Sequence, residues 1–193
     1  MSDAKSTIMQ AASKLFLEGG YKALSVRAIA KEAGVSTIGI YSHFDGKQGI
    51  LDALYIEGFE QVEATTRLPE GVRDRDAAIE TVVRQYLRSV RAHEAHYRLI
   101  FGEQSPDFSP SEEARQAGTQ AFASLLERSA EFLPDHAADE VRNAALEIWA
   151  LIHGFVSLRQ HVTALKTEGT DWEDQVVRAV RIHIAALDQT RTS

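Results

Sequence analysis

The sequence predicts an all-α protein, and three observations carry this prediction. Apolar residues recur along most of the chain at the three- and four-residue spacing of one helix face, as at Val26, Ile29, Ala30 and Ala33. The alternation of apolar and polar residues that marks half-buried strands is nearly absent. Only four prolines interrupt the 193 residues, so the sequence leaves room for long helices.

Composition narrows the class of protein. The chain is 44% hydrophobic and 25% charged, as an ordinary globular protein is. It has no cysteine, so neither disulfides nor thiolate zinc sites can contribute. No stretch approaches the roughly 20 apolar residues of a membrane span, and the N-terminus lacks an apolar signal region. We therefore expect a cytoplasmic protein without a membrane partner.

The first predicted helix covers about residues 4–18. Gly19 and Gly20 follow it, and they favour its end. We expect this helix to pack behind the next two and to hold them at a fixed angle. Its apolar stripe is Ile8, Ala11, Ala12, Leu15 and Phe16.

Residues 25–47 predict a helix-turn-helix. Ser25 is a good cap for its first helix, Gly34 favours the helix end, and Ser36 is a second cap. Ile40 and Phe44 share the inner face of the second helix, which is the element that reads DNA in such motifs. The outer face and flank are small, polar and nearly uncharged: Thr37, Ile38, Gly39, Tyr41, Ser42 and His43.

At these residues the sequence resembles the tetracycline-repressor (TetR) family of transcriptional regulators. The matching run begins at Ile8 and ends at Lys47, and it has no gaps. It depends on the stripe of the first helix, on both caps and the turn, and on Tyr41, His43, Phe44 and Lys47. Ile38 and Gly39 depart from the usual pattern, so the resemblance does not predict the operator sequence.

The resemblance implies a DNA-binding domain over residues 1–48, with three helices, and an effector-binding and dimerisation bundle over residues 49–193. It implies a repressor that binds a palindromic double-stranded DNA operator as a homodimer and is released by a small molecule. Lys47 stands at the start of the following helix, where a helix N-terminus beside a cation attracts a phosphate. The expected DNA contacts are Ser25, Arg27, Ser36, Thr37, Ile38, Gly39, Tyr41, Ser42, His43 and Lys47.

Two questions about this segment stay open, one about its overall role and one about Ile38. The whole segment could be an ordinary helical hairpin of a bundle, without a DNA partner. Ile38, on the outward face, could be a mere surface residue or an apolar contact to a thymine methyl group.

The charge balance permits DNA binding without establishing it. The net charge is −7, but residues 1–55 carry +1 and the remainder carries −8. The acidity therefore lies away from the helix-turn-helix, although +1 is no basic patch.

The rest of the chain predicts six more helices. A polar joint at residues 67–76, with Pro69 and Gly71, separates the first of them from the others. The expected helices cover about residues 46–65, 77–90, 96–101, 111–132, 141–158 and 172–187.

Residues 141–158 are apolar nearly all round, and a helix of this kind must be covered on every side. One chain of this size offers limited cover, so the pattern indicates a second subunit. The resemblance likewise implies that the last two helices pair with their mates in a dimer. The expected interface residues are Trp149, Ile152, Val156, Val177, Val180 and Ile184.

The bundle is expected to hold an effector cavity with aromatic walls and one titratable polar group. This lining suits a largely apolar or aromatic small molecule. His153 is either that polar anchor or a hydrogen-bonded core histidine. The expected lining residues are Tyr86, Phe101, Phe122, Trp149 and His153.

An enzyme is the main alternative to a DNA-binding regulator. His93 and His96, with Glu94 between them, invite a His/Glu site, but two ligands do not close a metal site. No nucleophile, base and orienting group occur together, so we expect no enzyme, no metal and no cofactor. A helical dimer that binds only protein partners is the other alternative.

Overall fold

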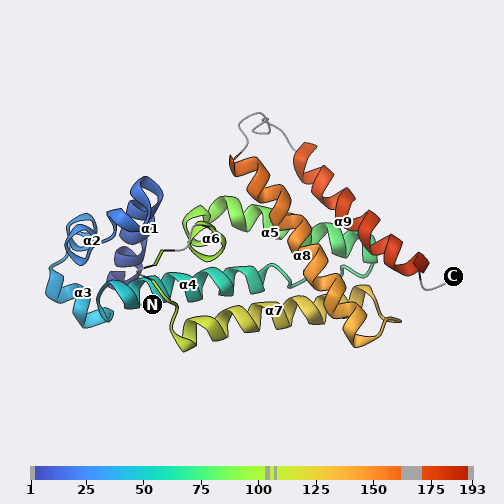
Figure 1. The fold of residues 1–193 in the computed structure, drawn as a ribbon, viewed down its shortest axis with the longest axis horizontal. Coiled ribbons are helices and arrows are strands. Elements are labelled where there is room, and N and C mark those ends of the chain that lie inside the picture. Colours follow the sequence, from blue (N-terminus) through green and yellow to red (C-terminus); the bar gives the residue numbers. More distant parts are fainter. Residues whose placement is uncertain (1–2, 103–104, 107, 162–170, 191–193) are drawn as a thin grey trace. The chain divides into compact units, whose positions relative to one another are not determined.

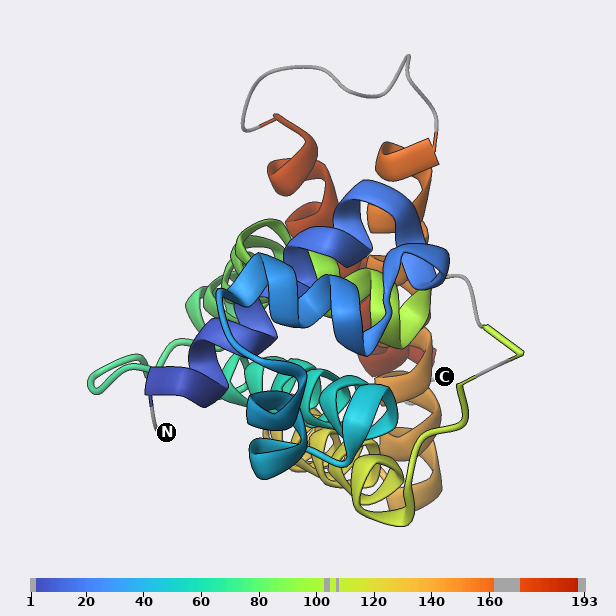
Figure 2. The same ribbon diagram turned by 90° about the vertical axis from the view of Figure 1, so that its left-hand side faces the viewer.

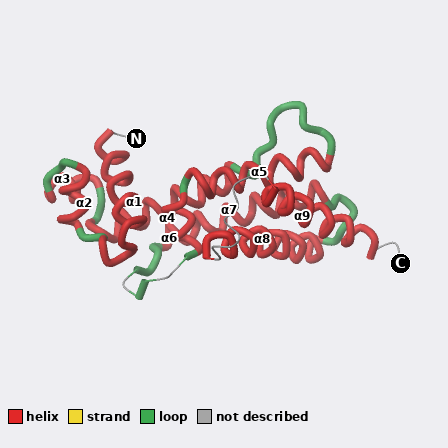
Figure 3. The backbone as a smooth tube through the Cα atoms, turned by 90° about the horizontal axis from the view of Figure 1, so that it is seen from above, coloured by secondary structure: helices red, strands yellow, loops and turns green. Residues whose placement is uncertain are grey.

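A computed structural model describes residues 3–102, 105–106, 108–161 and 171–190. Every regular element in these ranges is a helix, which confirms the all-α class (Figure 3). The helices in order are α1 (Asp3–Ala23), α2 (Val26–Ala33), α3 (Thr37–His43), α4 (Gly46–Ala64), α5 (Arg75–Ala92), α6 (Glu94–Phe101), α7 (Glu112–Phe132), α8 (Ala138–His161) and α9 (Asp171–Thr190) (Figure 1). In the described part of the chain, none of them is long and apolar enough to cross a membrane.

The chain divides into two compact units. The first contains residues 1–61 and 90–120, and the second contains residues 62–89 and 121–193. This division differs from the boundary expected after residue 48. The difference has a physical cause, because Leu54 of α4 and Leu99 of α6 belong to the same buried cluster as α1, α2 and α3.

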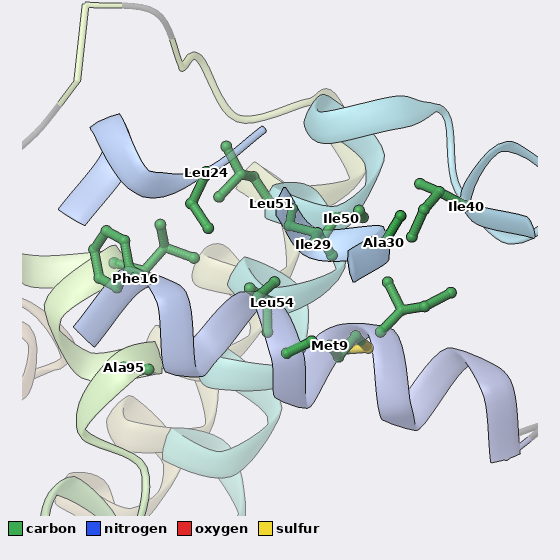
Figure 4. Close-up of a cluster of buried hydrophobic side chains, with 14 residues drawn as sticks. Met9, Phe16, Leu24, Ile29, Ala30, Ile40, Ile50, Leu51, Leu54 and Ala95 are labelled. Carbon is green, nitrogen blue, oxygen red and sulfur yellow. The ribbon is translucent and has the colours of Figure 1, made fainter. Parts of the chain in front are cut away.

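The core of the first unit is built mainly from one face of each of its helices. The cluster contains Met9 and Phe16 of α1, Ile29 of α2, Ile40 of α3 and Leu51 of α4 (Figure 4). The regular part of α1 ends at Gly19 and Gly20, as expected from the sequence, and Gly20 has a positive φ of 62°. This shared core fixes α2 and α3 against α1 and α4.

The second unit is held by apolar packing and by ion pairs. Helices α8 and α9 run alongside one another (Figure 1). Arg84 of α5 pairs with Glu80 of its own helix at 2.8 Å and with the buried Glu173 of α9 at 3.5 Å. Arg181 of α9 also reaches Glu80, at 2.9 Å. These pairs tie α5 to α9, and both helices supply walls of the cavity described below.

The single chain already covers most of the residues expected at the dimer interface. Val177, Val180 and Ile184 are buried at 3%, 1% and 2% exposure within the single chain. Ile152 and Val156 are likewise buried. A side chain that its own chain already covers has almost no surface left to bury against a partner.

Helix α8 has two different faces, which explains this burial. Ile148 and Ile152 point into the unit, whereas Leu146 and Leu158 are 45% and 54% exposed. The exposed face continues through Ala150 and Gly154. Counting apolar residues could not tell which of them the chain itself covers.

Candidate nucleic-acid interface and ligand cavity

The two short helices of the first unit have the caps that the sequence predicted. The Ser25 hydroxyl accepts a hydrogen bond from the Ala28 amide at 3.1 Å, and the Ser36 hydroxyl accepts one from the Gly39 amide at 3.0 Å. Between them Gly34 takes a left-handed conformation, with φ 66°, in which it ends α2. The chain therefore turns sharply from α2 into α3 (Figure 2). The sequence predicts that α3 is the helix that reads DNA, and on that expectation we call it the recognition helix from here on.

The outer face of the recognition helix is exposed and uncharged. Ile38 is 79% exposed and Tyr41 is 62% exposed, while Ile40 on the inner face is fully buried. Thr37 is exposed, and so is Ser42. The Ser42 hydroxyl donates to the Gly39 carbonyl at 2.8 Å, which leaves its oxygen able to accept a hydrogen bond from a base.

The remaining predicted DNA-contacting residues lie around this face. Gly39 and His43 are half-buried on α3, and Arg27 is exposed on α2. The Lys47 ammonium donates to the Tyr21 carbonyl at 3.3 Å, which anchors it to the end of α1.

Gly46, where α4 begins, makes room for the ring of Tyr41. It has a φ of +60°, and a Cβ atom there would lie 3.2 Å from Cε1 of Tyr41. The Tyr41 phenol is thereby held beside the N-terminus of α4, where partial positive charge favours a phosphate.

The second unit contains a narrow apolar cavity of about 50 Å³. Tyr86 and Trp149, both expected from the sequence, line it. Ile152, Val180 and Ile184, expected at the dimer interface, line it too. The other lining residues are Val62, Thr65, Thr66, Ile79, Val82, Val83, Ala121, Leu125, Arg128, Ser129, Phe132 and Ile148.

The other three predicted effector residues do not line the cavity. Phe122 stacks on the ring of Trp149, with centroids 5.6 Å apart. His153 stands 2.9 Å from the Tyr86 hydroxyl, through its Nε2 atom. Phe101 belongs to the first unit, where it packs against the Phe59 ring at 5.7 Å. Phe101 therefore does not join the aromatic group around Tyr86 and Trp149.

His153 is a partly buried, uncharged histidine at neutral pH. Burial lowers its pKa to about 4 from the usual 6.5, because the cation would lose its hydration there. Its hydrogen bond to Tyr86 positions a residue that lines the cavity. This contact is of the kind expected for a hydrogen-bonded core histidine, and His153 itself does not line the cavity.

Sequence reasoning missed the polar residues of the cavity. Thr65 and Thr66 donate their hydroxyl hydrogens to the carbonyls of Val62 and Glu63, at 2.6 and 2.8 Å. The Arg128 Nε atom donates to the Thr66 carbonyl at 2.9 Å. One signal was available in the sequence, because Ser129 falls four residues after Leu125 and three before Phe132, on the apolar face of α7.

A larger hollow, of about 430 Å³, lies in the first unit, beside His93 and His96. The His96 Nε2 atom pairs with the Glu57 carboxylate at 3.0 Å and so joins α6 to α4. Burial lowers the pKa of His93, and His96 nearby lowers it further. This hollow has charged walls, so an apolar molecule gains less there than in the second unit. Within the described residues, no three His, Asp or Glu side chains form a metal-binding group.

Comparison with known families accounts for both units. Residues 8–54 match the family described as "Bacterial regulatory proteins, tetR family". Residues 79–187 match "Tetracyclin repressor-like, C-terminal domain", which covers more than half of the chain. The chain belongs to the TetR family. It is therefore a TetR-family transcriptional regulator with an N-terminal helix-turn-helix and a C-terminal helical domain.

Individual relatives of this TetR-family protein are distant. The transcriptional regulator UidR of Escherichia coli is 31% identical over 80 residues, which is 41% of each chain. The match thus spans about two fifths of that relative's length. The uncharacterised regulator YhgD of Bacillus subtilis is 24% identical over 90% of this chain and 86% of its own. A TetR-family regulator from Streptomyces coelicolor shares the fold, with a TM-score of 0.68, 24% identity, and coverage of 96% of this chain and 99% of its own.

Proposed function

We propose that this TetR-family regulator is a ligand-responsive repressor. It binds a near-palindromic operator as a homodimer and leaves the DNA when a small, largely apolar effector occupies the cavity of the second unit. The observation that carries this proposal is the capped recognition helix, whose outer face is exposed and uncharged.

The chemistry of that face suits the major groove. Thr37 and Ser42 offer hydroxyl groups that can bond to base edges, and Ile38 offers an apolar surface that fits a thymine methyl group. Lys47, Arg27 and the Tyr41 phenol lie around the face and suit phosphates, which position a protein on DNA without reading its sequence.

The outer faces of α8 and α9 suit the dimer contact. Three of the exposed large apolar side chains lie there, namely Leu146, Leu158 and Ile182. Ala150 and Gly154 lie between the two leucines at four-residue spacing, and both are small enough for a close approach of two helices. These exposed residues replace the buried ones that the sequence suggested.

The narrow cavity supports a two-state response. A cavity of about 50 Å³ is smaller than the roughly 150 Å³ that holds a benzene ring in another protein, so an effector must widen it. The effector then favours a wide state over this narrow one, and the narrow state is the DNA-binding one. A ligand that bound both states equally would shift nothing.

The decisive experiment selects genomic DNA fragments with the purified protein and sequences them. The proposal requires a shared site of two inverted half-sites about 34–36 Å apart. Selection without a shared site, while the protein remains folded, would rule out the operator and favour a helical dimer that binds only proteins.

Replacement of Lys47 by Ala should weaken binding to all DNA sequences alike. It removes one phosphate contact, so the slope of log affinity against log salt should fall by about one unit, while base preference stays the same. Arg88→Ala on α5 is the matched control, because Arg88 is exposed and lies in the other unit. A changed base preference with an unchanged salt slope would contradict this role of Lys47.

Replacement of Ile38 by Ala should cost affinity only where a thymine methyl group is present. Replacing each operator thymine in turn by uracil removes one methyl group, and a double-mutant cycle with Ile38→Ala measures the coupling. We expect about 1 kcal/mol at one thymine per half-site and none elsewhere, as for the burial of one methyl group. Thr37→Ala, taken through the same substitutions, is the control. If each uracil substitution changes operator affinity equally for the wild-type protein and for Ile38→Ala, Ile38 does not contact a thymine methyl group.

A further inference from the structure

The polar groups of the cavity are not equally available to a ligand. The Tyr86 hydroxyl is bonded to His153, and both threonine hydroxyls donate to backbone carbonyls. Ser129 is 2% exposed and lines the cavity, yet its hydroxyl has no partner among the described residues. Of these four hydroxyl groups, the Ser129 hydroxyl is therefore the one that remains available to a ligand.

Arg128 stands next to Ser129 on α7. It is the only charged side chain among the described residues that line the cavity, and no carboxylate lines it. Its side chain is 18% exposed. Nε is bonded to the Thr66 carbonyl, and Nη1 to the carboxylate of Glu131, which is itself outside the lining. Nη2 has no partner in the described part of the chain.

We propose that the effector carries an anionic head, such as a carboxylate, on an apolar body, and that Arg128 and Ser129 of the cavity bind that head. This inference rests on the proposed function and deepens it. The apolar walls would receive the body. Transfer of a carboxylate from water into an apolar cavity is unfavourable unless hydrogen-bond donors bind it there. Arg128 and Ser129 are two such donors at adjacent positions in the cavity wall. Hydrogen bonds from a guanidinium to a carboxylate are roughly twice as strong as those between neutral groups.

The same contact connects the ligand to the recognition helix. Arg128 holds the Thr66 carbonyl, two residues beyond the end of α4, and α4 begins three residues after α3 ends. A carboxylate bound at Nη2 draws the guanidinium toward itself and so weakens the hydrogen bond from Nε to the Thr66 carbonyl. Its binding therefore loosens the end of α4, and this change lowers operator affinity.

The test uses matched acids and amides, which share shape and differ in charge. We chose 1-naphthaleneacetate with 1-naphthaleneacetamide, phenylacetate with phenylacetamide, and octanoate with octanamide. Binding to the full-length protein is measured by calorimetry, and operator affinity by fluorescence anisotropy with and without each compound. At least one acid should bind at least about tenfold more tightly than its amide and should weaken operator binding.

Three variants assign the preference to its residue. Arg128→Met keeps most of the apolar length of the side chain, and it should bind acid and amide equally. Glu131→Gln frees Arg128 from a competing carboxylate, so it should bind the acid at least as tightly as the wild type. Arg88→Met removes an exposed arginine of α5 that lies in the same unit but outside the cavity lining, and it should change nothing. Melting curves show that each variant is folded.

Three results would overturn the inference. They are equal binding of acid and amide by the wild type, an acid preference that survives in Arg128→Met, and failure of every acid to bind up to about 1 mM. Each leaves the operator selection untouched, so the inference about the ligand can fail while the proposed DNA-binding function stands.

Discussion

Replacement of Val180 by Asp should unfold the second unit. Val180 is 1% exposed and lines the cavity, so the carboxylate would be buried without a partner. We expect a loss of more than about 4 kcal/mol, which is a large fraction of the 5–15 kcal/mol that holds a typical domain. Circular dichroism and thermal melting measure the loss.

Ile182→Asp is the matched control on the same helix. Ile182 is 63% exposed, so its replacement leaves the packing of the single chain within about 0.5 kcal/mol of the wild type. Because it lies on the proposed dimer face, the variant should sediment as a folded monomer of 21.4 kDa. A folded, monomeric Val180→Asp protein would contradict the burial seen here and would return Val180 to the interface.

His153 should make the protein less stable in mild acid. The pKa of His153 is about 4 in the folded chain, against the usual 6.5. Between these two pH values the imidazole is protonated in the unfolded chain and neutral in the folded chain, so acid favours unfolding. This contribution to stability is complete above pH 6.5 and is lost as the pH falls toward 4. Between pH 7 and pH 5 the loss should reach about 2 kcal/mol.

Urea unfolding at each pH measures this loss, and His153→Gln should remove most of it. Glutamine can still meet the Tyr86 hydroxyl but does not titrate. His93→Gln is the control, because the more exposed His93 should contribute much less. The measurements stay above pH 5 so that the titration of carboxylates does not contribute. The hydrogen bond from Arg84, for example, lowers the pKa of Glu80. An unchanged pH dependence in His153→Gln would show that His153 is hydrated in the folded protein.

The recognition motif could be predicted from the sequence because its signals are local. A serine cap, a glycine at a helix end and apolar residues three and four apart each act within one or two helical turns. Ser25, Gly34 and Ser36 therefore have the roles that their spacing indicates, and Ile38 and Ile40 lie on the expected faces. The same local rules gave the extents of the later helices to within a few residues.

The candidate ligand site could be predicted only in part, since a cavity depends on which segments meet. Aromatic character singled out Tyr86 and Trp149, which line the cavity, but it also selected Phe101, which packs in the other unit. Ser129 at least falls on the apolar face of α7, but nothing in the sequence distinguishes Arg128 from an ordinary surface arginine until α7 is packed against its neighbours.

The sequence by itself therefore determined the helix class, the family and the recognition helix, because each depends on residues within a few turns of one another. Only the tertiary structure decided which apolar residues of α8 and α9 the chain covers for itself. It assigned Val180 and Ile184 to the interior and Leu158 and Ile182 to the surface. The physical reason is that hydrophobicity is a property of a side chain, whereas burial depends on neighbours that are far away in the sequence, as Val62 and Val180 of the cavity wall are from each other.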